Sequence, residues 1–196
     1  QPRGAAYYAF RIREETTTEL TAEQIHALGL AEVARIRGEM EEVAKRAGFA
    51  SREAFIAELR TNQEHFADTS EELLASAALT AKRIEGQLPR YFGRLPRLPF
   101  GLQPIPAETA EGTTTAYYGP GSPEAGIAGT YYVNTSKLDQ RPLWELPALT
   151  LHEAVPGHHL QIALQQELEI PDWRRHGAFF TAFVEGWALY SELLGI

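Results

Sequence analysis

Cysteine is absent from the sequence. The chain therefore has no disulfide framework, no thiol nucleophile and no thiolate ligands for a metal ion. It also has no apolar run of the roughly 18 residues that a membrane-spanning helix needs, and its N-terminus lacks the basic and then apolar order of a signal peptide. The chain opens on QPRGAAYYAF and stops at ELLGI, inside an expected helix. We therefore expect a fragment of a longer protein, and periplasmic, lipoprotein and cytoplasmic locations all stay open.

The sequence also has fewer basic than acidic residues. Lys and Arg number 18 against 26 Asp and Glu, which gives a net charge of −8. Nucleic-acid binding favours a basic surface, so this balance argues against a nucleic-acid partner. Hydrophobic residues make up 44% of the 196 positions and charged residues 22%, the ordinary balance of a soluble globular protein. We therefore expect one folded region over residues 1–196.

Helical periodicity dominates residues 21–100. Thr21 is followed three residues later by Gln24, the pattern of a capping box, and apolar residues then recur at helical spacing. Thr69 has a similar place before another apolar series. Upstream, residues 5–14 are rich in aromatic side chains, and we interpret them as a short strand or the exit from a preceding element.

The pattern changes within residues 89–106, which contain five prolines and predict an irregular, partly extended crossover. Residues 107–136 combine a Gly/Pro turn with GTYYVNTS, whose β-branched and aromatic residues are typical of a strand. Residues 143–196 return to helical spacing. The sequence therefore predicts a mainly α fold, with a small β hairpin or sheet placed just before a pair of helices.

The string LHEAVPGHHLQ at residues 151–161 concentrates the chemically active side chains. It places His152, Glu153, His158 and His159 within eight positions. Neutral imidazole is a good zinc ligand, and a carboxylate beside the first histidine can take a proton from water that the metal polarises. This combination indicates a hydrolytic zinc site.

The spacing of the two histidines does not suit a regular helix. The familiar helical zinc motif has its second histidine four residues after the first, and here that position is Pro156. Six residues advance about 9 Å along a helix, whereas two nitrogens on one zinc lie about 3.3 Å apart. A bulge at Pro156 and Gly157 would return His158 to the place of the second ligand. His159, seven residues from His152 and nearly in phase with it, is the alternative ligand.

The strings HEAVPGHHLQ and FVEGWALYSELL, the second at residues 183–194, resemble the bacterial DUF885 family, and the likeness extends over the whole chain from TTTELTAEQIHALGLAEVARI onward. That family is grouped by resemblance with zinc peptidases of the gluzincin type. The resemblance implies a mostly helical metallopeptidase-like fold. Many members have no characterised activity, and some are thought to be lipoproteins.

A third protein ligand is needed to complete a catalytic zinc site, with the fourth position left for water. Glu185 is our candidate, from its position in the second motif and from the family resemblance. It lies in an otherwise apolar stretch, where a bare carboxylate would be costly unless it were paired or coordinated. The alternative is a buried carboxylate that hydrogen bonds to tyrosine or arginine.

Other roles follow from the expected reaction. Glu153 would be the general base, and Tyr190 or His176 would donate a hydrogen bond to the oxyanion. In gluzincin-type peptidases an edge strand lines the cleft, so the resemblance implies that Tyr131, Tyr132 and Asn134 contact substrate. Packing of the tyrosines between sheet and helices is the competing interpretation.

The hypothesis is a zinc-dependent hydrolase of amide bonds, with a peptide or small amide as substrate. One alternative keeps the metal and changes the substrate to a non-peptide amide or an ester. A second is a metal-binding helical module without turnover, and a third is a metal-free cluster of hydrogen-bonded histidines.

The bulge gives a prediction that any structure can test. We expect the helix to be irregular at residues 155–157, so that the rings of His152 and His158 meet one ion with Glu185. A straight helix from 150 to 165, with these two rings more than about 6 Å apart, could not hold zinc at bonds of about 2.1 Å.

Overall fold

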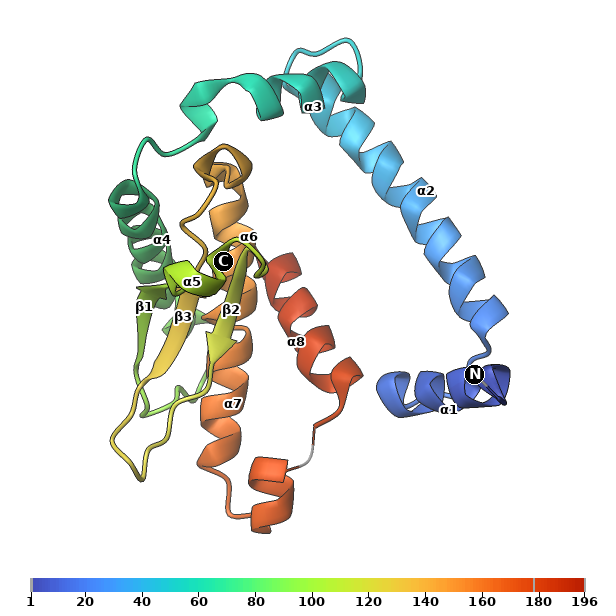
Figure 1. Cartoon of the computed structure of the whole chain (residues 1–196), viewed down its shortest axis with the longest axis vertical. Coiled ribbons are helices and arrows are strands. Elements are labelled where there is room, and N and C mark those ends of the chain that lie inside the picture. The colour runs from blue at the N-terminus through green and yellow to red at the C-terminus, as the bar shows by residue number, and fades with distance from the viewer. Residues whose placement is uncertain (1, 178, 196) are drawn as a thin grey trace. The chain divides into compact units, whose positions relative to one another are not determined.

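A computed structural model describes residues 2–177 and 179–195. It confirms a mainly α fold with one small three-stranded sheet (Figure 1). The chain divides into two compact units, residues 1–63 with 180–182 and residues 64–179 with 183–196. Among the described residues, no helix combines the length and the apolar character that crossing a membrane requires.

The first unit contains three helices, α1 (Gly4–Thr16), α2 (Ala22–Arg46) and α3 (Arg52–Thr61). The capping box expected at the start of α2 is confirmed. The side chain of Thr21 accepts a hydrogen bond from the backbone N–H of Gln24 at 3.2 Å, and the side chain of Gln24 accepts one from the backbone N–H of Thr21 at 2.8 Å. Two otherwise unpaired amide groups at the helix end are thereby satisfied.

The strand interpretation of residues 5–14 is wrong, because these residues belong to α1. Arg11 forms ion pairs with Glu14 and Glu15, one turn further along the helix. Arg13 lies in the last turn, where a cation interacts favourably with the helix dipole. These charge pairs at helical spacing support the helix.

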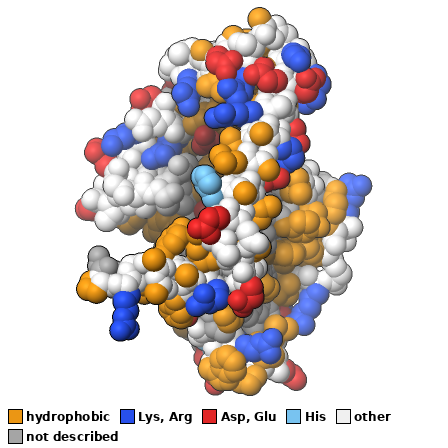
Figure 2. Space-filling view, turned by 90° about the vertical axis from the view of Figure 1, so that its right-hand side faces the viewer, with side chains coloured by type: hydrophobic (Ala, Val, Ile, Leu, Met, Phe, Trp, Pro, Cys, Tyr) orange, Lys and Arg blue, Asp and Glu red, His pale blue; other side chains and the backbone are white. Residues whose placement is uncertain are grey.

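Helix α2 has an apolar face that the other helices of its own unit leave exposed. Figure 2 shows one face of the molecule with side chains coloured by type, and many of the side chains on that face are hydrophobic. The exposed members on α2, between 39% and 60% accessible, are Leu28, Leu30, Val33, Ile36, Met40 and Val43.

The second unit is built on α4 (Ser70–Glu85), which packs against α6 (Leu146–Glu153) and the sheet. Thr69 caps α4 as expected, since its side chain accepts a hydrogen bond from the backbone N–H of Glu72 at 3.1 Å. Leu73 on α4 lies in the main hydrophobic cluster. This core therefore holds α4, α6 and the sheet together, and α6 carries His152 and Glu153 of the motif.

The sheet has the strand order β1-β3-β2, formed by β1 (Phe100–Pro104), β2 (Ala116–Gly119) and β3 (Gly129–Val133). β3 is parallel to β1 and antiparallel to β2. β3 is thus the central strand, which corrects the expectation that it lines a cleft as an edge strand. β1 comes from the proline-rich crossover and lies at an edge, where Pro104 is tolerated at the strand end.

The remaining elements connect this framework. Helix α7 (His158–Gln166) follows α6 end to end, and α8 (Thr181–Leu194) lies beside them (Figure 1). The short segments are α5 (Ala107–Ala110), a π-helical turn at Trp173–Gly177, and 3₁₀ turns at Gln63–His65, Leu88–Arg90, Leu138–Gln140 and Leu143–Glu145.

Replacing Leu73 by alanine should lower the free energy of unfolding by about 2–5 kcal/mol, because it leaves a cavity in a well-packed cluster. Leu73 is 1% exposed, whereas Leu79 on the same helix is 52% exposed. The matched change Leu79→Ala should therefore alter stability by no more than about 0.5 kcal/mol. Urea unfolding followed by circular dichroism measures both, and equal effects would contradict the assigned core.

Candidate metal centre

The helix that carries the motif is interrupted. α6 ends at Glu153 and α7 begins at His158, and the backbone between them leaves the helical region at Ala154 (φ −99°, ψ −100°) and Gly157 (φ −70°, ψ −128°). The Val155–Pro156 peptide bond is cis. Across the interruption, the N–H of His159 donates to the carbonyl of Ala154 at 3.0 Å, five residues back instead of four. The predicted irregularity at residues 155–157 is confirmed.

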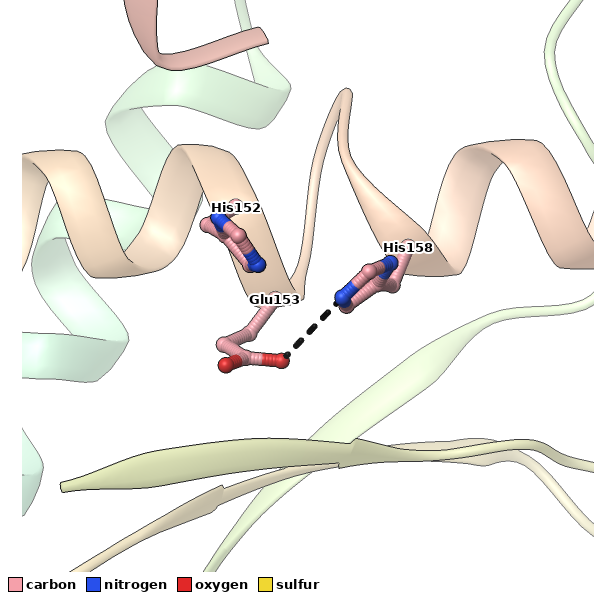
Figure 3. Close-up of side chains that lie close together, drawn as sticks. All are labelled: His152, Glu153 and His158. Carbon is pink, nitrogen blue, oxygen red and sulfur yellow. Dashed lines mark ion pairs between the residues drawn. The ribbon is translucent and has the colours of Figure 1, made fainter. Parts of the chain in front are cut away.

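The interruption brings the two histidines together. The ring centroids of His152 and His158 lie 4.8 Å apart, with the ring planes at 90°. Figure 3 shows the two rings projecting into the same space from the two sides of the looped-out segment, with Glu153 beside them. The ligand atoms of His152, Glu153 and His158 all lie within 4.8 Å of one another. Residues six positions apart thus share one site.

Gly157 is required by space at this interruption. A Cβ atom there would lie 1.8 Å from the carbonyl oxygen of His152 and 2.4 Å from that of Leu151. Its φ of −70° lies outside the left-handed region, so the close approach of a Cβ atom is what excludes a side chain at this position. The loop can therefore fold back on the end of α6 only where the side chain is a hydrogen atom.

The carboxylate of Glu185 on α8 meets both rings. Its Oε2 lies 3.3 Å from Nε2 of His152, and its Oε1 lies 3.8 Å from Nε2 of His158. Two ligands of one zinc with bonds of about 2.1 Å lie about 3.3 Å apart, which equals the first of these distances and is shorter than the second. The side chain of Glu185 is 45% exposed, which corrects the expectation of a carboxylate in apolar surroundings.

Hydrogen bonds hold α8 against the interrupted helix. The indole N–H of Trp187 donates to the carbonyl of Pro156 at 2.7 Å, within the looped-out segment. The side chain of Gln161 on α7 donates to the carbonyl of Phe183 at 3.1 Å. Glu185 lies between these two attachment points on α8, so its position is fixed relative to the histidines.

Glu192 is a site residue that the sequence analysis missed. Its Oε1 lies 2.7 Å from Nδ1 of His152. A hydrogen bond of this kind holds the ring in one orientation and leaves Nε2 free on the side of Glu185. The available signal was its distance of seven residues from Glu185, nearly two full helical turns, which puts both carboxylates on one side of α8.

Glu153 is 9% exposed, and its Oε2 lies 3.9 Å from Nε2 of His158. Burial raises the pKa of Glu153, partly opposed by the charge of His152. A raised carboxylate pKa suits a group that takes up a proton near neutral pH. A cavity of about 230 Å³ lies beside it, lined by Glu145, Ala148, Leu149, His152, Glu153 and Glu192.

The two adjacent histidines have different surroundings. Burial, together with the charge of His152, lowers the pKa of His158, which favours the neutral ring that a metal needs. Its Nδ1 is buried without a hydrogen-bond partner. Both nitrogens of His159 lie at hydrogen-bond distance from protein groups, Nδ1 2.9 Å from the hydroxyl of Tyr118 and Nε2 3.0 Å from the carbonyl of Leu98. The geometry therefore favours His158 over His159 as the ligand.

The residues expected to contact substrate occupy the central strand and the segment after it. Tyr131 and Asn134 are 0% exposed, and the Asn134 amide donates to the carbonyls of Ala110 and Thr114 at 2.6 and 3.0 Å. Tyr132 stacks on Tyr117 with ring centroids 4.7 Å apart. Burial leaves Tyr131 and Asn134 no surface for substrate, so this part of the interpretation is corrected to a packing role.

The two expected oxyanion donors are both on the surface. Tyr190 on α8 is 52% exposed, with its ring centroid 5.9 Å from that of Trp187. His176 is exposed in the turn Trp173–Gly177. The described contacts of the His152, His158 and Glu185 cluster include neither side chain.

A family model described as "Bacterial protein of unknown function (DUF885)" matches residues 1–196. A solved structure titled as the "putative lipoprotein from Colwellia psychrerythraea" matches with a TM-score of 0.93 and 33% sequence identity. The match covers 99% of this chain and 34% of that protein, so the chain spans about a third of its length. No curated protein matches the chain.

Replacing Gly157 by alanine should displace the looped-out segment, because the added methyl group meets backbone carbonyls that cannot move without unwinding α6. We expect a lower affinity for zinc, the metal that the sequence predicts for this site, and a stability loss of about 1–3 kcal/mol. Gly186 on α8 is the matched control, since a Cβ atom there meets nothing within 4 Å. Isothermal titration with zinc and thermal unfolding measure both variants. Unchanged zinc affinity in Gly157→Ala would contradict the spatial argument.

Proposed function

We propose that this chain, which belongs to the DUF885 family of bacterial proteins, carries the active site of a zinc-dependent hydrolase of amide bonds, of the gluzincin type and with peptides as substrates. The observation that carries the proposal is the meeting of two imidazole Nε2 atoms at a single carboxylate. His152 and His158 lie 3.3 and 3.8 Å from the oxygens of Glu185.

The chemistry of these donors supports zinc. Two neutral imidazoles and one carboxylate are a common protein ligand set of catalytic zinc, which leaves a further position open. Glu192 supports the same assignment, because ligating histidines commonly donate their second N–H to a carboxylate. When bound, a zinc ion supplies Lewis-acid chemistry and a water nucleophile at neutral pH.

Glu153 moves the proton in the proposed reaction. It lies beside the histidine pair and lines the adjacent cavity. Its carboxylate takes a proton from the attacking water and returns it to the leaving amine, and its raised pKa brings the two steps closer in energy. Glu192 already hydrogen bonds to His152, so Glu153 is the carboxylate of the cluster that remains available as the general base. Tyr190, on the same helix as Glu185, stays the candidate donor to the oxyanion.

The wild-type protein should bind about one zinc ion per chain and cleave members of a peptide library. Elemental analysis after purification without chelator measures the metal, and mass spectrometry of the digest measures cleavage. Stoichiometric zinc without cleavage of peptides, other amides or esters would indicate a metal-binding module. Absence of zinc both after purification and after reconstitution would end the proposal.

Replacing Glu153 by glutamine should keep the zinc and lower kcat by about 10²–10⁴-fold, because the amide has a similar shape but cannot accept the proton. Glu145→Gln is the matched control, since Glu145 lines the same cavity without belonging to the histidine cluster. Zinc content and initial rates should be measured on both variants. Activity that survives Glu153→Gln would assign the base to another group, and a parallel loss of zinc would give Glu153 a structural role.

A further inference from the structure

His159 is the second residue of α7 and directly follows the proposed ligand His158. It is 2% exposed, and its ring packs against Phe100 on β1 and Tyr118 on β2, with centroid distances of 4.9 and 5.5 Å. A polar ring at this depth is stable only when both nitrogens have hydrogen-bond partners. The surroundings of His159 therefore have to supply an acceptor for one nitrogen and a donor for the other.

Two hydrogen bonds tie the ring of His159 to two separate segments. Its Nε2 lies 3.0 Å from the carbonyl oxygen of Leu98, in the crossover before β1, and its Nδ1 lies 2.9 Å from the hydroxyl of Tyr118. A carbonyl can only accept, so in the neutral ring Nε2 donates to Leu98 and Nδ1 accepts from Tyr118. Because each bond has a preferred direction, the two together fix the place and the orientation of the ring.

Gly129, the first residue of β3, keeps the space that the second of these bonds needs. A Cβ atom at Gly129 would lie 2.9 Å from Nδ1 of His159 and closer still to the hydroxyl of Tyr118. Neither approach is possible without moving one of the two groups. The contact between Tyr118 and His159 therefore depends on the absence of a side chain on the neighbouring strand.

The main chain connects this anchored ring to the proposed ligand. His158 and His159 share a peptide bond in the first turn of α7, and the N–H of His159 donates to the carbonyl of Ala154 at 3.0 Å, across the looped-out segment. His159 is thus held by its side chain and by its backbone. The ring of His158, one residue earlier, meets that of His152. A shift or rotation of His159 would therefore move His158 relative to His152.

The ring of His158 has less direct support than its partner in the site. Nδ1 of His152 lies 2.7 Å from Oε1 of Glu192, which holds that ring in one orientation. Nδ1 of His158 is buried and has no hydrogen-bond partner among the described residues. Packing of Leu160, which is 3% exposed, also supports the first turn of α7, but apolar burial is non-directional. The bonds of His159 are therefore the directed contacts that fix this turn against the sheet.

We propose that His159 is a positioning residue for the metal site, which holds the first turn of α7 so that Nε2 of His158 can reach a zinc ion. It does so through its two hydrogen bonds, to Tyr118 on β2 and to Leu98 in the crossover. The inference rests on the proposed function for the metal itself. His159 acts through its neighbour in the chain and binds neither metal nor substrate.

Titration of the metal-free protein with zinc, in competition with a chromogenic chelator, tests the inference. Tyr118→Phe removes the hydroxyl and keeps the ring, so the anchored turn becomes less populated, and zinc affinity should fall by about 10-fold, the size of one lost hydrogen bond. Tyr117→Phe is the matched control on β2, because the ring of Tyr117 stacks on Tyr132 instead, and its zinc affinity should match that of the wild type. Unchanged zinc affinity in Tyr118→Phe would overturn the positioning role.

Gly129→Ala breaks the same contact without changing either partner. It should weaken zinc binding at least as far as Tyr118→Phe, and adding Tyr118→Phe to it should weaken binding no further, because both changes remove one interaction. Gly101→Ala on β1 is the control, since a Cβ atom there meets nothing within 4 Å. Additive losses in the double variant would contradict a single shared contact. If Gly129→Ala does not fold by circular dichroism, Tyr118→Phe decides alone.

An NMR measurement on the metal-free protein separates this inference from the proposed function. The chain has six histidines, so histidine-labelled protein gives few ring signals, and those of His158 are identified by their loss in His158→Gln. In Tyr118→Phe they should shift by more than those of His152, whereas Tyr117→Phe should leave them in place.

This readout needs neither zinc nor turnover. A wild-type protein that binds no zinc would end the proposed function, and the ring signals of His158 would still decide whether His159 positions that residue. Ring signals of His158 that stay unchanged in Tyr118→Phe would overturn the inference, whatever the protein binds.

Discussion

The site depends on one close approach, that of Gly157 to the carbonyl oxygens at the end of α6. A Cβ atom at position 157 would lie 1.8 Å from the carbonyl of His152. Because this approach is possible, the chain can loop out after Glu153 and resume a helix at His158, and two histidines six residues apart come to share one space. A regular helix would separate them by about 9 Å along its axis.

Helix α8 converts this pair of rings into a set of three donors. Trp187 bonds to the looped-out segment itself, through the carbonyl of Pro156, and Glu192 orients His152. Glu185 lies on the same helix between these two contacts and the Gln161 contact at Phe183. The looped-out segment is therefore both the reason that the histidines meet and the docking point of the helix that brings the carboxylate. The strings at residues 151–161 and 183–194 therefore act as a single unit in space.

Local chemistry made part of this structure predictable. Thr21 and Thr69 predicted the starts of their helices, because their side chains are suited to cap a helix. Pro156 and Gly157 predicted the interruption, because the spacing of the two histidines does not suit a regular helix. The strand order was not predictable, because β1 and β3 lie far apart in the sequence and no local pattern in either segment indicates that they pair. The family resemblance implies an edge position for β3, which is central, and substrate contacts for Tyr131 and Asn134, which are buried. Glu192 was missed because its partner, His152, lies 40 residues away.

Anomalous diffraction at the zinc absorption edge, from crystals of the protein grown with zinc, tests the central claim most directly. The account predicts one strong peak about 2.1 Å from Nε2 of His152, from Nε2 of His158 and from an oxygen of Glu185. His159 should keep its hydrogen bonds to Tyr118 and Leu98 in the same crystals. A peak bound by His159, or no peak at the interrupted helix, would contradict the account.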